Sequence, residues 1–251
     1  MSETGTRGGR YRIKPAGRRM EKPKAKSSNS GTVREAIFGL NDGLVATIGL
    51  VSGEALSHQP RGSIVIAGLS AVGAAMVSMA VGSYLATSSE NDFMNKEIRQ
   101  QERAIREHPK REHHHVRHLL KDIGVPSHTV PDTAANIVAR RPRWLKFMIR
   151  ENLGIHQNRA EKPLKNSLVM AAAVIVGSAP PVIPYLLPLG LAMARDISWA
   201  VAVVAALVLG AVKGVLTETS VAKSSVAFGV LVSLSALVGA LIGFGLGMAG
   251  A

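Results

Sequence analysis

The apolar residues of this chain are gathered into long blocks rather than spread periodically along it. Residues 63–86 contain no charged side chain, and a helix of this length exceeds the roughly 20 residues that cross about 30 Å of hydrocarbon. Similar blocks cover residues 167–189, 197–212 and 225–251. The pattern predicts membrane-spanning helices.

A fifth apolar block, residues 36–56, contains two carboxylates, Asp42 and Glu54. A hydropathy window alone gives this block a low score, but we predict that it is the first of five spans. The predicted fold class is therefore an all-α integral membrane protein, with five transmembrane helices and a small helical cytoplasmic domain between the second and the third.

The stretch between the second and third spans has helix signals of its own. The second span is expected to continue into water as a helix until Pro109 removes a backbone donor. Pro109, Pro131 and Pro142 each suit the first turn of a new helix, while Gly124 and Gly154 suit helix ends. These signals predict three short helices.

We therefore expect four regions. They are a disordered basic cytoplasmic tail (1–33), spans one and two (34–89), the cytoplasmic helical domain (90–165) and spans three to five (166–251).

The distribution of basic residues predicts how the chain is oriented in the membrane. The chain has 30 Lys and Arg against 17 Asp and Glu, a net charge of +13, which in another context would indicate nucleic-acid binding. All but two of the basic residues, Arg61 and Arg195, lie before the first span, in residues 90–165, or beside the loop between the last two spans. The alternation of spans puts these segments on one side, which the positive-inside rule identifies as the cytoplasm, with the N-terminus. We expect membrane lipid, and no nucleic acid, as a partner.

Two residues in the predicted spans point to metal chemistry. An ionisable group in hydrocarbon is costly and normally faces a water-filled path, a cation or a partner, and Asp42 is such a group. Met79 lies in the middle of the second span, and a carboxylate with a thioether favours a borderline transition metal such as Fe²⁺ or Mn²⁺ over magnesium or calcium. The alternatives are an interfacial Asp42 that caps its helix, and a Met79 that only fills the core.

The predicted cytoplasmic domain holds a second constellation, because five of the eight histidines lie within residues 108–118. Glu112 and His115 are three residues apart and His114 and His118 are four apart, so either pair can chelate one ion from a single helix face. Imidazole and carboxylate suit zinc, iron, nickel or manganese. A solvated polar helix or a pH-sensitive patch is the alternative.

No nucleophile with its base, phosphate-cradling Gly loop or nucleotide motif is apparent, so we expect neither an enzyme nor an organic cofactor. The absence of cysteine excludes disulfides and thiolate metal sites.

Three motifs resemble those of the vacuolar iron transporter family, proton-coupled transporters of ferrous iron and manganese in plants, fungi, protists and bacteria. Residues 34–45, which include Asp42, resemble the first-span signature. Residues 78–86 resemble the second-span signature and residues 181–185 the third. The similarity covers about residues 32–247.

The resemblance implies that Asp42 and Met79 are metal ligands in a translocation path at a homodimer interface. It also implies that the loop is a metal-binding domain that gathers ions before transport. Its implied ligands are Glu112, His115, Met148 and Glu151.

The chain departs from the family pattern at three positions. Ala71 stands where members often have a glutamate in the second span, and Gln101 and Ala104 align with the first pair of loop glutamates. One carboxylate is thus lost from the membrane path and two from the loop site, which implies a weaker or differently selective loop site.

We therefore expect a dimeric metal ion and proton antiporter that exports ferrous iron, or also manganese, from the cytoplasm, with Asp42 binding metal and proton in turn. The alternative is a non-transporting membrane sensor or scaffold with a His-rich metal-binding loop. The expected location is a bacterial plasma membrane, or the vacuolar membrane if the source is eukaryotic.

Overall fold

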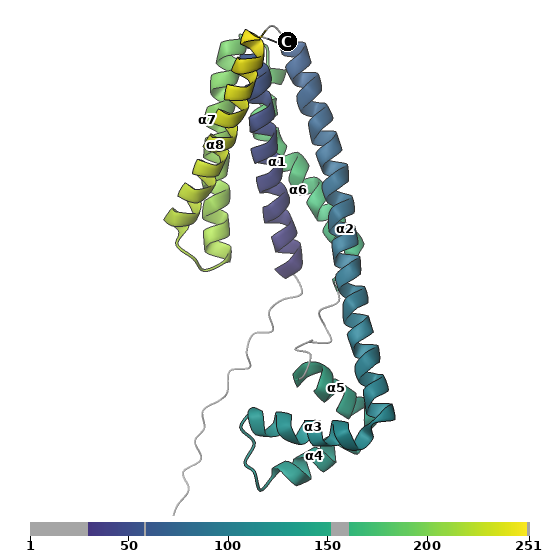
Figure 1. Ribbon diagram of the computed structural model, residues 1–251. Helices are drawn as coiled ribbons and strands as arrows, with labels where there is room; N and C mark the ends of the chain where they lie inside the picture. Colours follow the sequence, from purple (N-terminus) through teal and green to yellow (C-terminus); the bar gives the residue numbers. More distant parts are fainter. Residues whose placement is uncertain (1–29, 58, 152–160, 250–251) are drawn as a thin grey trace, which may run out of the picture.

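The computed structural model describes residues 30–57, 59–151 and 161–249, and within them every regular element is an α-helix (Figure 1). Five of these helices are long and apolar enough to cross a membrane, which confirms the predicted all-α multi-pass membrane protein. They are α1 (Ser30–Leu56), α2 (Arg61–Glu107), α6 (Pro163–Leu186), α7 (Leu191–Leu216) and α8 (Val221–Met248).

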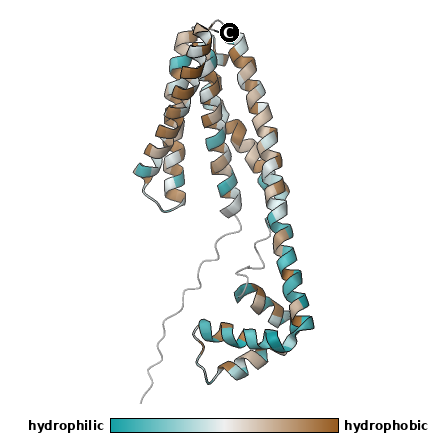
Figure 2. Ribbon diagram, in the orientation of Figure 1, coloured by the Kyte–Doolittle hydropathy of each residue, from teal (hydrophilic) through white to brown (hydrophobic). Residues whose placement is uncertain are grey.

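Helix α2 continues well past the membrane span, as its sequence predicts. Its 47 residues correspond to a length of about 70 Å. The half near the bundle is mostly apolar and the projecting half is mostly polar (Figure 2). At its tip it carries α3 (Pro109–Asp122), α4 (Val130–Val138) and α5 (Arg141–Glu151); we call these three helices the loop domain, and the opposite end of the bundle the far side.

Prolines and a glycine set the helix ends in the loop domain. Pro109 is the first residue of α3, and Pro131 and Pro142 are the second residues of α4 and α5, where a missing N–H leaves no helical hydrogen bond unmade. Gly124 follows α3 with a φ of 85°, a conformation that glycine adopts without strain. The expected end of the last helix at Gly154 lies outside the described residues.

The loop domain has its own apolar core, closed on one side by α2. Its fully or nearly buried members are Ile105, Val116, Leu120, Val130, Ala134, Trp144 and Met148.

Glycines bring α1 into backbone contact with its two main neighbours, α6 and α8. A Cβ placed on Gly177 of α6 would overlap the carbonyl oxygen of Leu40, and one on Gly239 of α8 would overlap that of Gly49. A Cβ on Gly243 would overlap the carbonyl oxygen of Gly53. Small residues allow helix backbones to approach this closely in a membrane.

A cluster of prolines does not interrupt α6. The helix contains Pro180, Pro181 and Pro184 and continues to Leu186. Each proline removes the N–H that would bond the carbonyl four residues earlier, and membrane helices tolerate this when local adjustments or neighbouring groups compensate. Ser198 Oγ of α7 donates to the carbonyl of Pro181 (2.8 Å), which ties α7 to α6 beside the prolines.

Arg61, at the start of α2, closes the far end of α6. Its guanidinium donates to the carbonyl of Tyr185 (2.6 Å) and also to that of Leu187. These carbonyls belong to the last helical turn and the residue after it, which have no helical N–H partner. The cation and the negative end of the helix dipole also attract each other.

Helix α7 is longer at both ends than the predicted span of residues 197–212. At its start, Arg195 forms an ion pair with Asp196 (2.9 Å) and lies 5.6 Å from the centroid of the Trp199 ring. These contacts partly compensate both charges, so the first turns of the helix can include them. The predicted span begins directly after these two residues, because an uncompensated charge is unfavourable in hydrocarbon.

We predict that Gly243→Ala destabilises the protein by about 1–3 kcal/mol, the usual range for inserting a methyl group into a filled core. The added Cβ would overlap the α1 backbone. Gly245→Ala on the same helix is the matched control, since a Cβ there has no neighbour within 4 Å. Thermal unfolding of the protein in detergent should show a lower midpoint for Gly243→Ala only; equal midpoints would contradict the role assigned to this contact.

Candidate metal sites

Two contacts fix how α1 and α2 lie relative to each other. Near the loop domain, Ser83 Oγ of α2 donates a hydrogen bond to Glu35 Oε2 of α1 (3.0 Å). Toward the far side, a Cβ on Gly68 of α2 would lie 3.6 Å from Val51 Cγ1 of α1. The two helices are therefore antiparallel, and Asp42 lies at a level between these contacts.

Asp42 is partly buried and shares a face of α1 with Glu35, because seven residues make two helical turns. The backbone beside it is held by α6, since Ser178 Oγ donates to the carbonyl of Gly43 (3.1 Å). Asp42 lies about 100° around the helix from this glycine. The carboxylate is thus placed on a helix whose position is fixed by packing.

Met79 is also partly buried, and it lies one turn from Ser83 on the same face of α2. Met76 is a second thioether on this face, which the sequence analysis did not single out. Counted from the two contacts between the helices, Asp42 lies at about the level of Met76 and Met79. Met76 and Ser83 are seven residues apart, so the sequence alone puts them on one face of α2. Only the hydrogen bond between Ser83 and Glu35 shows that this face lies toward α1.

Glu35 is a further residue whose role the sequence analysis missed. It is only 8 % exposed, although it lies near the start of the first span. Its second carboxylate oxygen is 3.3 Å from the guanidinium of Arg34. A buried carboxylate with one hydrogen bond and one cation retains free lone pairs that can accept a proton or a metal ion.

Asn166 joins three helices beside Glu35. Its side chain is almost fully buried, accepts from Thr32 Oγ1 of α1 (3.5 Å), and donates to Thr87 Oγ1 of α2 (3.4 Å) and to Glu161 Oε2 (2.6 Å). We call this set the polar junction: Thr32, Glu35, Ser83, Thr87, Glu161 and Asn166. It lies where α1, α2 and α6 leave the span toward the loop domain.

In the loop domain, two of the predicted ligands line a groove. Glu112 is buried and its Oε2 accepts from Gln101 Nε2 (2.9 Å) and lies 3.8 Å from His115 Nδ1. The groove is lined by Gln101, Arg111, Glu112, His114, His115 and His118. Gln101 thus supplies an amide donor to the Glu112 carboxylate.

The other two predicted loop ligands are not among the residues that line this groove. Met148 is fully buried in the apolar core of the loop domain. Glu151 is the last described residue of α5, and its carboxylate contacts Arg150 Nε (3.1 Å). In the described ranges no three His, Asp or Glu side chains converge as a ready-made metal site. The assignment of the six sequence-predicted ligands therefore stays a prediction.

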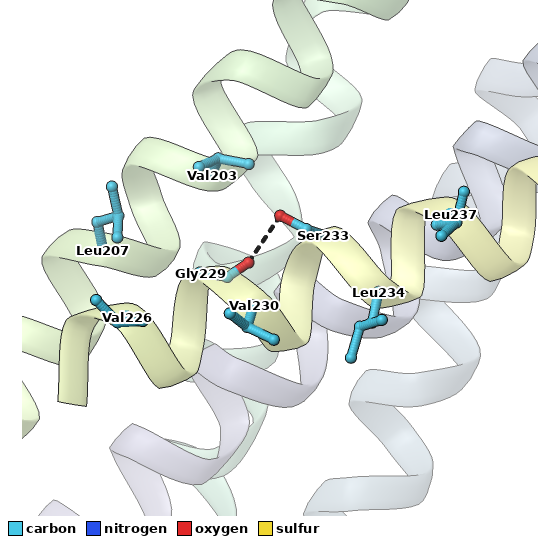
Figure 3. A pocket seen from close by; sticks show the side chains of 8 residues that line it. All are labelled: Val203, Leu207, Val226, Gly229, Val230, Ser233, Leu234 and Leu237. Atoms are coloured by element: carbon cyan, nitrogen blue, oxygen red, sulfur yellow. Dashed lines mark hydrogen bonds between the residues drawn. The ribbon is translucent and has the colours of Figure 1, made fainter. Parts of the chain in front are cut away.

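A hollow between α7 and α8 is unsuited to metal. Its lining is aliphatic apart from Ser233, and the Ser233 hydroxyl donates to the carbonyl of Gly229 on its own helix (2.8 Å) (Figure 3). Its lining contains no carboxylate, imidazole or sulfur, which are the ligands that transition metals prefer.

The fold and these polar residues define a class, namely multi-pass helical membrane proteins with ionisable groups inside the span. The comparison with known sequences is more specific, because the model of the VIT family matches residues 33–244. The chain belongs to the VIT family.

Curated relatives agree with this membership. The chain is 30% identical to vacuolar iron transporter 1 of Tulipa gesneriana over 210 residues, which cover 83% of this chain and 82% of that protein. It is 28% identical to vacuolar iron transporter 1 of Oryza sativa subsp. japonica, with 78% and 77% covered. A vacuolar iron transporter of Acanthamoeba castellanii is 26% identical, with 62% and 56% covered.

We predict that Asn166→Ala lowers stability by about 1–3 kcal/mol, because it leaves buried hydrogen-bonding groups of the polar junction unsatisfied. Asn95→Ala, at an exposed position of the projecting part of α2, is the control. The measurement is again the unfolding midpoint in detergent. A midpoint for Asn166→Ala that matches that of the control would show that the junction does not hold the three helices together.

Proposed function

We propose that the protein is a metal ion and proton antiporter that exports ferrous iron, with manganese as a second candidate, from the cytoplasm. The observation that carries the proposal is the position of Asp42: a carboxylate on a membrane-crossing helix, on one face with the buried Glu35. Membership in the VIT family and relatives named vacuolar iron transporters support it.

The proposed path follows the facing sides of α1 and α2. An ion from the loop-domain side first meets the carboxylate of Glu35, which the polar junction positions. It then reaches Asp42, at the level of the thioethers of Met76 and Met79. Oxygen and sulfur donors together favour a borderline ion such as Fe²⁺ over magnesium and calcium, which prefer oxygen alone.

The coupling of metal export to proton entry follows from the free-energy cost of an isolated charge in hydrocarbon. When the metal leaves Asp42 toward the far side, a bare carboxylate is unfavourable, so a proton from that side replaces the metal. The protonated form then releases its proton to the cytoplasm when the next ion binds. Ala71 contributes no carboxylate from α2, so the exchange in the membrane falls to carboxylates of α1, of which Asp42 lies at the level of the two thioethers.

The proposed assembly is a homodimer with the path at the interface. Exposed apolar side chains on both helices are compatible with a second copy as well as with lipid; they include Phe38 on α1 and Val77 and Val81 on α2. The loop domain and the N-terminus then lie in the cytoplasm, in agreement with the positive-inside rule. The membrane is a bacterial plasma membrane, or a vacuolar membrane in a eukaryotic source.

Asp42→Asn should abolish proton-driven uptake of ferrous iron by proteoliposomes, because the amide cannot exchange a proton for metal. Asp196→Asn is the matched control, since Asp196 is exposed at the start of α7 and pairs with Arg195; it should transport as the unchanged protein does. Uptake that survives Asp42→Asn would refute the mechanism. Metal binding without any flux in the unchanged protein would favour a sensor or scaffold instead.

Met79→Leu should reduce ferrous iron uptake several-fold more than manganese uptake, because it removes the sulfur donor and Mn²⁺ depends less on soft ligands. Met193→Leu, at an exposed position of α7, controls for the loss of a methionine. The measurement is the ratio of the two uptake rates in the same vesicles. An unchanged ratio would remove Met79 from the proposed ligands.

A further inference from the structure

We propose that His114 and His118 form a separate metal site on α3, selective for ions that prefer imidazole, such as Ni²⁺ and Zn²⁺, over Fe²⁺ and Mn²⁺. This site is distinct from the Glu112 position and goes beyond the transport function proposed above. It is an inference about equilibrium binding, so it stands or fails independently of any flux through the membrane.

The geometry of the two rings carries the inference. Their centroids are 4.8 Å apart and their planes are inclined by 60°. Residues four apart lie on one face of a helix, one turn above the other. Small rotations of the two side chains therefore bring one nitrogen of each ring to the same ion, and both residues are exposed, so water completes the coordination.

The surroundings separate this pair from the Glu112 position. The Glu112 carboxylate is buried and already accepts from Gln101, and His115 lies beside it. His114 and His118 line the outer part of the same groove and have no carboxylate partner among the described ion pairs. Two chemically different half-sites thus lie side by side on α3: one with a carboxylate and one with imidazole alone.

The two imidazole donors determine which metal ions this site prefers. Binding to nitrogen ligands strengthens from Mn²⁺ and Fe²⁺ to Ni²⁺ and Cu²⁺, and Zn²⁺ also binds imidazole well. An all-imidazole pair lacks the oxygen donors that hold harder ions. It therefore discriminates against the ions of the proposed transport path and in favour of later transition metals.

Most charges around the pair are repulsive to cations. Arg111 lines the groove, and Lys110, Arg117 and Lys121 are exposed on the same helix, where Asp122 at the last position is the exposed acidic exception. Binding must therefore come from coordination rather than from electrostatic attraction. Added salt should leave the affinity unchanged or raise it slightly, whereas a site that depends on carboxylates weakens as salt screens the attraction.

The test is calorimetric titration of NiCl₂ into the untagged full-length protein in detergent. The double variant His114→Ala/His118→Ala should bind Ni²⁺ at least about tenfold more weakly at this site, since losing even a residue that only orients a ligand costs about 10–100-fold. His128→Ala, an exposed histidine outside the groove, should leave the affinity unchanged. MnCl₂ should give little heat at this site in any variant.

A second variant separates chelation from the mere number of histidines. His118→Ala/Lys121→His keeps the number of imidazoles on α3 but moves the partner of His114 to a position seven residues and roughly 10 Å away, too far for one ion. It should lose as much affinity as the double alanine variant. Wild-type affinity in either variant, or equal affinity for Mn²⁺ and Ni²⁺ in the unchanged protein, would overturn the proposal.

Discussion

The close approach of α1 to α6 and α8 is the constraint on which the rest of the structure depends. Glycines at the crossing points leave room for carbonyl oxygens where a side chain would otherwise lie. Hydrogen bonds from Ser178 and Ser235 to α1 carbonyls accompany these crossings. Such bonds between membrane helices contribute only about 0.6 kcal/mol each on average, so dense backbone packing must supply most of the stabilisation. This backbone packing fixes the position of α1, the helix that carries Asp42.

Much of the architecture could be predicted from the sequence, because its signals are local. Pro109, Pro131 and Pro142 open helices where an absent N–H is harmless, and long uncharged runs define spans by length. The prediction was weaker at α7, whose charged first turn is compensated by contacts between side chains.

The candidate sites could be predicted only in part, because they depend on contacts between segments distant in sequence. Asp42 stands out by itself as a charge inside a span. Glu35 does not, since only its hydrogen bond with Ser83, 48 residues away, shows that it is buried. In the loop domain, helical spacing correctly puts His115 beside Glu112. Helical spacing does not predict the distance between Met148 and Glu112, because the burial of Met148 depends on how α2, α3, α4 and α5 pack together.

The continuity of α2 has a mechanical consequence. One uninterrupted helix runs from the far side of the bundle to the loop domain, so a change of its tilt inside the bundle would be transmitted along its length to the loop domain. About 20 residues project beyond Thr87, or roughly 30 Å, and a tilt of 10° would swing the tip by about 5 Å. A displacement of the loop domain and a change in tilt at the face of α2 that bears Met76 and Met79 would therefore accompany each other.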